Sequence, residues 1–223
     1  MPDTKREPVK KPLPDEAGEK VAGLILGAGA STRMGKTKQL LATGRGPLIE
    51  RVLREALGSG LDAVVLVLGH KADEIRTALA STISHPKLHV IQNPDYLKGM
   101  STSLIAGLSR VEATHDHVMI LLADMPHVTA GLINALCSRY LTSRLPLGAL
   151  SVKGRRTLPV ILNRRFYPHI HRLRGDVGAR ALFRRYPDRV CLVEPDLPYD
   201  DLDIDTPEDY ARYMTPPTPH GKP

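Results

Sequence analysis

Apolar runs of strand length alternate along this chain with longer stretches that suit helices. The runs cover residues 21–26, 63–68, 88–91, 118–123, 148–152 and 159–162. The helix-compatible stretches cover residues 48–57, 72–80, 101–109 and 129–140. Because the runs are apolar throughout, they are typical of strands buried on both faces. The order of strand and helix therefore predicts an α/β three-layer sandwich, with a mostly parallel sheet and helices on both faces.

The length and composition favour one folded domain. A chain of 223 residues with 42% hydrophobic residues can bury a single core of good size. Both ends are rich in proline and polar residues, so we predict disordered tails at 1–20 and 215–223 around a domain at 21–214. No run of eighteen apolar residues and no secretory leader pattern appears, and the two cysteines lie in apolar contexts. We expect a cytoplasmic protein without a membrane partner.

Positive charge gathers in one segment. Residues 151–195 hold eleven Lys and Arg residues against three acidic residues. Such a cluster indicates an anionic partner, which on charge alone could be a polyphosphate, a phosphorylated metabolite or nucleic acid. The chain has no Trp and only two Phe, so the aromatic platforms that stack single-stranded bases are scarce. We therefore expect no nucleic-acid partner.

A turn of small residues follows the first apolar run, at the sheet edge where ligands of such folds bind. Gly27, Ala28 and Gly29 allow a close backbone approach, and free N–H groups in such a turn attract anions. Arg33 and Lys38 follow directly and supply fixed positive charge for phosphates. The segment is predicted to hold a triphosphate.

Two familiar phosphate loops do not fit this segment. The dinucleotide pattern GxGxxG requires a third glycine where the chain has Thr32. The P-loop pattern requires a glycine five residues before Gly35, where the chain has Ala30.

Carboxylates follow two other segments. Asp124 comes directly after the run 118–123, at the same predicted sheet edge as the glycine turn. A second acidic cluster with Asp203 and Asp205 precedes a helical stretch that Thr206 could cap and Pro207 could begin. Two carboxylates completed by phosphate oxygens and water are typical of Mg²⁺ sites. Asp124 and Asp205 are the predicted ligands, with Asp203 as the alternative to Asp205.

Three strings in the chain resemble the MobA-like nucleotidyltransferase family: LILGAGASTRMGKTKQLL, LADMP and DIDTPED. The resemblance covers about residues 21–213. It implies a Rossmann-like sandwich of the nucleotide-diphospho-sugar transferase type, in which Mg²⁺, or Mn²⁺ in its place, is held by Asp124 and Asp205. It also implies catalytic roles for Arg33, Lys38 and Asp124.

The same resemblance implies a nucleotide site. Alanine at the position of Ala28 is similar to the cytidylyltransferase branch, which uses CTP. A second segment after the run 88–91 contains GMSTSL, which resembles the family's base and ribose segment, and alone reads as a helix start that Ser101 could cap. The implied nucleotide-binding residues are Leu26, Gly27, Ala28, Gly29, Arg33, Lys38, Asn93, Gly99, Ser101 and Ser103.

Two basic segments resemble the acceptor motifs of molybdenum cofactor cytidylyltransferases. They are residues 154–160 and 174–180, and they imply acceptor binding by Arg155, Arg156 and Asp176. The chain departs from the motif in one place, because the usual Gly-His-Pro is replaced by Thr-Leu-Pro at 157–159.

The sequence therefore predicts an enzyme that moves CMP from CTP to the phosphate of molybdopterin or the molybdenum cofactor and releases pyrophosphate. A molybdenum enzyme or its chaperone would be the next partner. Three alternatives remain open: transfer to another phosphorylated acceptor such as a sugar phosphate, a nicotinamide- or flavin-dependent oxidoreductase, and a non-catalytic carrier of a cofactor.

Overall fold

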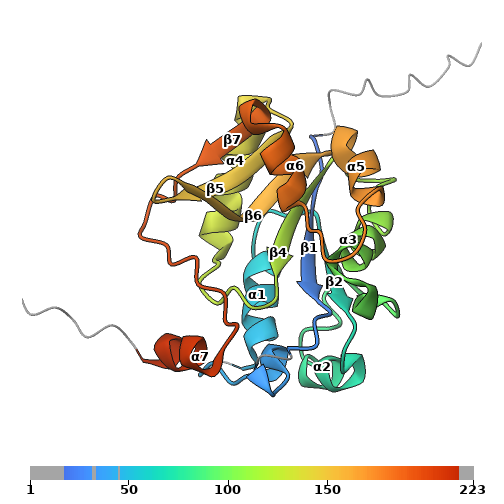
Figure 1. The fold of residues 1–223 in the computed structure, drawn as a ribbon, viewed down its shortest axis with the longest axis vertical. Helices are drawn as coiled ribbons and strands as arrows, with labels where there is room; N and C mark the ends of the chain where they lie inside the picture. The colour runs from blue at the N-terminus through green and yellow to red at the C-terminus, as the bar shows by residue number, and fades with distance from the viewer. Residues whose placement is uncertain (1–17, 32–33, 45, 216–223) are drawn as a thin grey trace, which may run out of the picture.

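The computed structural model describes residues 18–31, 34–44 and 46–215. Most of the two predicted tails, together with the predicted phosphate ligand Arg33, lie outside these residues. The described residues form one central sheet flanked by helices, as Figure 1 shows.

Seven strands make the sheet, in the order β3-β2-β1-β4-β6-β5-β7. Their bounds are β1 Val21–Gly27, β2 Ala63–Leu68, β3 Leu88–Gln92, β4 His117–Leu122, β5 Leu147–Val152, β6 Arg155–Asn163 and β7 Val190–Val193. Strands β3, β2, β1 and β4 run parallel, whereas β6 runs antiparallel to both of its neighbours, β4 and β5. The prediction of a mostly parallel sheet is confirmed.

Helices cover both faces of the sheet. They are α1 Leu48–Leu57, α2 Ala72–Ala78, α3 Met100–Ser109, α4 Ala130–Ser143, α5 Tyr167–His171, α6 Arg180–Arg185 and α7 Pro207–Met214. One core packs α1, α2 and α4 against the sheet, and a second core packs α3, α5 and α6 against the opposite face. Alternate residues of β2 enter the two cores, which explains why its sequence is apolar throughout.

The helix starts follow the sequence in two cases and differ in a third. Thr129 accepts a hydrogen bond from Leu132 N and caps α4, and Thr206 forms a capping box with Asp209 at α7. The prediction that Ser101 caps its helix is wrong, because α3 begins at Met100 and its N-cap is Gly99. Among the described residues, no helix is long and apolar enough to cross a membrane.

The reversed strand β6 determines where the basic segment lies. Lys153 and Gly154, both with positive φ, make the tight turn of the β5–β6 hairpin. Since β6 is antiparallel to β4, its first residues extend past the carboxyl end of β4. The arginines at the start of β6 and the ligand-binding ends of the parallel strands therefore lie at one edge of the sheet.

Candidate active site

The glycine turn after β1 is held in shape by Gln39. The buried amide of Gln39 donates hydrogen bonds from Nε2 to the carbonyl oxygens of Gly27, at 3.1 Å, and Gly29, at 2.9 Å. Its Oε1 accepts a hydrogen bond from Ser31 Oγ at 3.1 Å. Three hydrogen bonds from one buried side chain fix the turn, because each unpaired buried polar group would cost free energy. No motif in the sequence marks Gln39 as a site residue.

Lys38 lies between the two predicted metal ligands. Its Nζ donates hydrogen bonds to Asp124 Oδ2 and, at 2.9 Å, to Asp205 Oδ1. The three side chains are 17%, 9% and 33% exposed for Lys38, Asp124 and Asp205 respectively. Carboxylates separated by about eighty residues of sequence thus meet on one ammonium group beside the glycine turn.

The segment that carries Asp205 is fixed at both ends. Ile204 is fully buried, and its N–H donates to the carbonyl oxygen of Asp124 at 3.1 Å. After Asp205, the carboxylate of Asp209 accepts hydrogen bonds from the backbone N–H groups of Asp205 and Thr206. Helix α7 in turn contacts the segment after Lys38, where Tyr210 donates to the carbonyl oxygen of Ala42 at 2.7 Å.

The cluster carries more negative than positive charge. Burial lowers the pKa of the Lys38 ammonium, but the charges and hydrogen bonds of Asp124 and Asp205 outweigh burial and raise the pKa above its ordinary value. Burial, followed by the charges of Asp124 and Asp205, raises the pKa of Asp203 to about 7. The Oδ1 atom of Asp124 is buried and has no hydrogen-bond partner among the described residues. A further cation at this site would satisfy the Oδ1 atom of Asp124.

The predicted base segment is an ordered loop that leads into α3. Asn93 is 3% exposed, and its Nδ2 donates to Thr102 Oγ1 at 2.8 Å and to Ser103 Oγ at 3.0 Å. Ser101 and Ser103 are also buried. Gly99 adopts a φ of +106°, which L-residues rarely reach, and joins the short 3₁₀ turn 96–98 to the helix.

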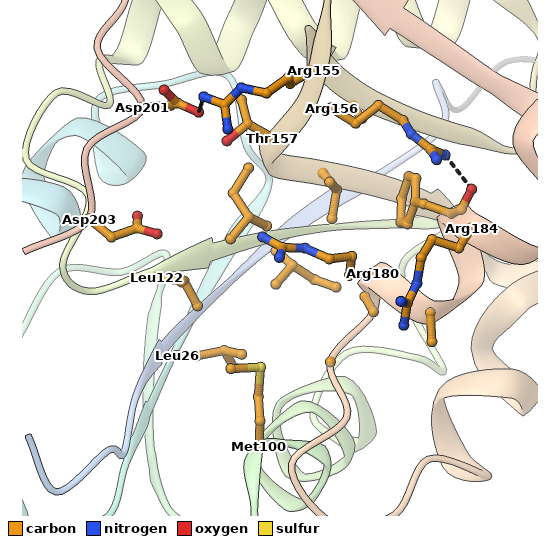
Figure 2. A pocket seen from close by; sticks show the side chains of 18 of the residues that line it. Leu26, Met100, Leu122, Arg155, Arg156, Thr157, Arg180, Arg184, Asp201 and Asp203 are labelled. Carbon is orange, nitrogen blue, oxygen red and sulfur yellow. Dashed lines mark hydrogen bonds and ion pairs between the residues drawn. The ribbon is translucent and has the colours of Figure 1, made fainter. Parts of the chain in front are cut away.

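A cavity of about 1060 Å³ opens beside the carboxyl end of β4. Figure 2 shows Leu26, Leu122 and Met100 on one side of it and the arginines of β6 and α6 on the other. Asp203 lines the cavity too, so the carboxylate cluster borders it. The cavity combines an apolar floor with walls that hold six basic and four acidic side chains, and this excess of basic groups suits an organic anion.

The arginines around the cavity differ in how they are engaged. Arg155 forms an ion pair with Asp201 at 3.3 Å, and Arg156 donates a hydrogen bond to the carbonyl oxygen of Phe183 (Figure 2). Within the part of the chain that the structure describes, the side chains of Arg180 and Arg184 have no such partner. These two arginines lie four residues apart on α6, and sequence analysis counted their charge without assigning them to the site.

The structure brings most of the predicted site residues into two neighbouring groups, while Asn93, Gly99, Ser101 and Ser103 lie in the loop and first turn of α3. In the first group Lys38 contacts both Asp124 and Asp205, next to the turn of Gly27 to Gly29. The second group lines the cavity: Leu26, Arg155, Arg156 and Asp176. Within the described ranges, no set of three or more His, Cys, Asp or Glu side chains is arranged to hold a metal by itself.

Comparison with known proteins places the chain in a family. Residues 23–190 match the model of the MobA-like NTP transferase domain. Purine catabolism protein PucB of Bacillus subtilis is 31% identical over 195 residues, which are 84% of this chain and 93% of that protein. Nicotine blue oxidoreductase of Paenarthrobacter nicotinovorans is 28% identical over 201 residues, 87% of this chain and 96% of its own length. Molybdenum cofactor cytidylyltransferase of Escherichia coli is 29% identical over 115 residues, 52% of this chain and 57% of that protein.

Solved structures show the same fold. Rv0371c of Mycobacterium tuberculosis superposes with a TM-score of 0.77 and 24% identity, over 89% of this chain and 98% of that one. A second crystal of Rv0371c is a complex with manganese, with a TM-score of 0.73 at the same identity over 87% of this chain and 98% of that one. The predicted nucleotide-diphospho-sugar transferase fold is confirmed, and the chain belongs to the MobA-like NTP transferase family of nucleotidyltransferases.

Proposed function

We propose that the protein transfers CMP from CTP to the phosphate of molybdopterin or the molybdenum cofactor, with release of pyrophosphate. The observation that carries the proposal is the contact of Lys38 with both Asp124 and Asp205 beside the glycine turn. Phosphoryl transfer needs fixed positive charge at the triphosphate and oxygen ligands for a divalent cation, and this cluster offers both.

The nucleotide would lie between the glycine turn and the start of α3. The backbone of Gly27, Ala28 and Gly29 would approach the phosphates, with Leu26 beside the base, and Lys38 and Arg33 would supply the cationic charge. Asn93 and Ser103 hydrogen-bond to each other, so they would shape the base segment around Gly99 and Ser101. Ala28 would favour cytosine, because alanine at this position resembles the cytidylyltransferase branch.

The carboxylate cluster fits a divalent cation of the Mg²⁺ or Mn²⁺ kind. Its donors are oxygens only, and the Oδ1 atom of Asp124 has no partner among the described residues. Asp124 and Asp205 share one ammonium group, and the charges of both act on Asp203 nearby. Asp124 and Asp205 would hold the ion, which would neutralise charge on the triphosphate and on departing pyrophosphate.

The chain's own residues would mainly position the reactants. An oxygen of the acceptor phosphate forms a bond with the α-phosphorus of CTP, the bond to the β-phosphate oxygen breaks, and pyrophosphate leaves with that electron pair. A phosphate monoester has a second pKa of about 6, so its attacking oxygen is largely deprotonated at neutral pH and needs no general base. Lys38 would hold the triphosphate in line with the acceptor.

The cavity beside the cluster is the proposed acceptor site. Arg155 and Arg156 belong to its basic wall, and Asp176 lines the cavity as well. The apolar floor suits a ring system, and the arginines suit a phosphate.

A second candidate is a nicotinamide-dependent oxidoreductase. The observation in its favour is the full-length similarity to a protein named nicotine blue oxidoreductase. Against it, the dinucleotide pattern lacks its third glycine, because Thr32 stands there.

The deciding experiment measures pyrophosphate release from each of CTP, GTP, ATP and UTP with Mg²⁺, and with molybdopterin or a sugar phosphate as acceptor. We expect release with CTP and molybdopterin only. Pyrophosphate release with a sugar phosphate would identify the acceptor as a sugar phosphate instead of molybdopterin. Release with another nucleotide would overturn the role of Ala28. Oxidation of NADH or NADPH by candidate acceptors, without pyrophosphate release, would establish the oxidoreductase instead.

A further inference from the structure

The loop between α5 and α6 packs directly on the start of α3. The N–H of Ser101 donates to the carbonyl oxygen of Gly175 at 3.1 Å, and the N–H of Met100 donates to Asp176 Oδ1 at 3.2 Å. The N-cap residue Gly99 has no side chain to accept these groups. Asp176, which lies 76 positions after Met100 in the chain, thus caps the helix. The carboxylate of Asp176 suits the positive end of the helix dipole.

The contact leaves no room for a larger residue at Gly99. A Cβ atom there would lie 2.3 Å from the carbonyl carbon of Gly175 and 2.6 Å from the N atom of Asp176. A Cβ atom at Gly178 would lie 2.8 Å from Met100 Sδ. Backbone therefore meets backbone at the first of these positions, and the loop cannot shift without moving the start of α3.

The two sides of this contact belong to different parts of the proposed site. Segment 99–103 belongs to the proposed nucleotide site, whereas the loop continues into α6, which carries Arg180 toward the cavity (Figure 2). A carboxylate in direct contact with an anionic acceptor would repel it. The bond from Met100 N instead holds the carboxylate of Asp176 at the positive helix end.

We propose that Asp176 is a positioning residue that caps α3 from the acceptor side and so couples the nucleotide segment to the acceptor helix α6. The inference rests on the proposed function for the identity of the two ligands. Under it, Asp176 acts on the acceptor through α6 and Arg180 and does not touch the acceptor itself. Removal of the Asp176 carboxylate makes both segment 99–103 and helix α6 less rigid.

The test compares Asp176→Ala with Asp176→Asn, whose side-chain oxygen can still accept the hydrogen bond from Met100 N. Binding of CTP with Mg²⁺ is measured calorimetrically in the absence of acceptor. We expect Asp176→Ala to weaken CTP binding by about 3- to 10-fold, the effect of losing one helix cap, and Asp176→Asn to bind like the wild type.

Gly99→Ala, which displaces the loop but keeps every carboxylate, should weaken CTP binding too. Asp188→Ala, an exposed aspartate after α6, is the matched control.

A second measurement works without any nucleotide. Amide hydrogen exchange of wild type and Asp176→Ala should show faster exchange in both 99–103 and 180–185. Unchanged exchange in 99–103, or unchanged CTP affinity together with a raised acceptor KM, would overturn the positioning role and make Asp176 a direct acceptor ligand. If the wild type binds no CTP, the proposed function fails, and the exchange result still decides whether Asp176 couples the two segments.

Discussion

Lys38 is one ammonium group among three carboxylates, and its charge does not balance theirs. It contacts Asp124 and Asp205, while Asp203 next to them has its pKa raised to about 7, by burial first and then by its acidic neighbours. A lysine in this place keeps the carboxylates together when no other cation is bound. It would then be free to contact phosphate once a divalent ion takes over the carboxylates.

Replacing the lysine should therefore make stability depend on metal. In Lys38→Met, the carboxylates face one another without a counter-charge, and we expect the melting temperature to fall by about 5 to 10 °C, as for a broken, partly buried ion pair. Millimolar Mg²⁺ should recover most of the loss and shift the wild type less. Thermal unfolding with and without Mg²⁺ measures both effects. Lys71→Met, which removes an exposed ion pair with Glu74, serves as control. Equal metal-induced shifts in Lys38→Met and wild type would contradict this role.

Asp124 is the acid most tightly built into the cluster. We expect Asp124→Asn to lower kcat by about 100-fold or more, because charge stabilisation at the transferring phosphate is lost. The fold should persist, since Lys38 keeps its contact with Asp205. The control is Asp116→Asn, which lies just before β4 as Asp124 lies just after it. Magnesium-dependent turnover at the wild-type rate in Asp124→Asn would remove Asp124 from the site.

At the scale of elements, the turn after β1 depends on a side chain from the 3₁₀ turn Lys38–Leu40. In Gln39→Ala, the carbonyl oxygens of Gly27 and Gly29 lose their donor. An unpaired buried group costs about 1–3 kcal/mol, so we expect the KM for CTP to rise roughly tenfold with a smaller change in kcat. Steady-state kinetics checks this against Gln92→Ala at the end of β3. A KM for CTP that stays at the wild-type value would show that the turn is held without Gln39.

The start of β4 gives a pH dependence of stability. Burial lowers the pKa of His117 below 6.5, against the opposing charges of Glu19 and Asp116, and its Nδ1 lies 2.9 Å from Tyr140 Oη. Below about pH 6.5 the unfolded chain therefore binds more protons than the folded one, and the free energy of unfolding falls as the pH falls through this window.

Urea unfolding between pH 7.5 and 5 measures the slope. We expect His117→Gln to flatten it relative to wild type. The remaining slope should come from the other histidines with a lowered pKa, His89 and His127. A slope that is the same in His117→Gln and wild type would show that this histidine is not the group that titrates.

The elements that the sequence predicts well are those with a two-sided burial pattern. Apart from His117 at the start of β4, strands β1, β2 and β4 are apolar throughout because both faces are covered, so their runs are visible in one sequence. Strand β7 was not predicted, because it is a four-residue edge strand with half-exposed residues. The start of α3 was misplaced because a glycine with positive φ and a distant carboxylate replace a local cap.

The site residues, too, could be predicted only where a local sequence pattern marks them. The sequence could predict that Lys38, Asp124 and Asp205 meet, because each of them lies in a recognisable motif. Gln39, Arg180 and Arg184 could not, because their roles depend on packing: Gln39 reaches back to the turn, and the arginines lie on a six-residue helix with little periodicity.

For the whole molecule, part of the positive charge of the segment 151–195 lies around the cavity, where five of its eleven basic residues are found. The arginines of β6 and α6 line one space with an apolar floor. Long-range attraction of this kind is screened by salt over a Debye length of about 10 Å at 0.1 M.

We therefore expect the KM for the acceptor to rise several-fold when ionic strength increases from about 0.05 to 0.3 M. The increase should be smaller in Arg180→Gln, in which one free guanidinium is gone. Initial-rate measurements at constant Mg²⁺ check both expectations. An acceptor KM that does not respond to salt would exclude charge as the basis of acceptor recognition.

The change of strand direction at β6 has a consequence for how such proteins diverge. The parallel strands β1 to β4 carry the glycine turn and Asp124, whereas the hairpin β5–β6 and helix α6 carry most of the cavity's basic wall. Under the proposed function, substitutions in the hairpin and α6 can select a new acceptor while the chemistry at the triphosphate stays intact. A lineage can thus diversify its products by altering the hairpin and α6 alone.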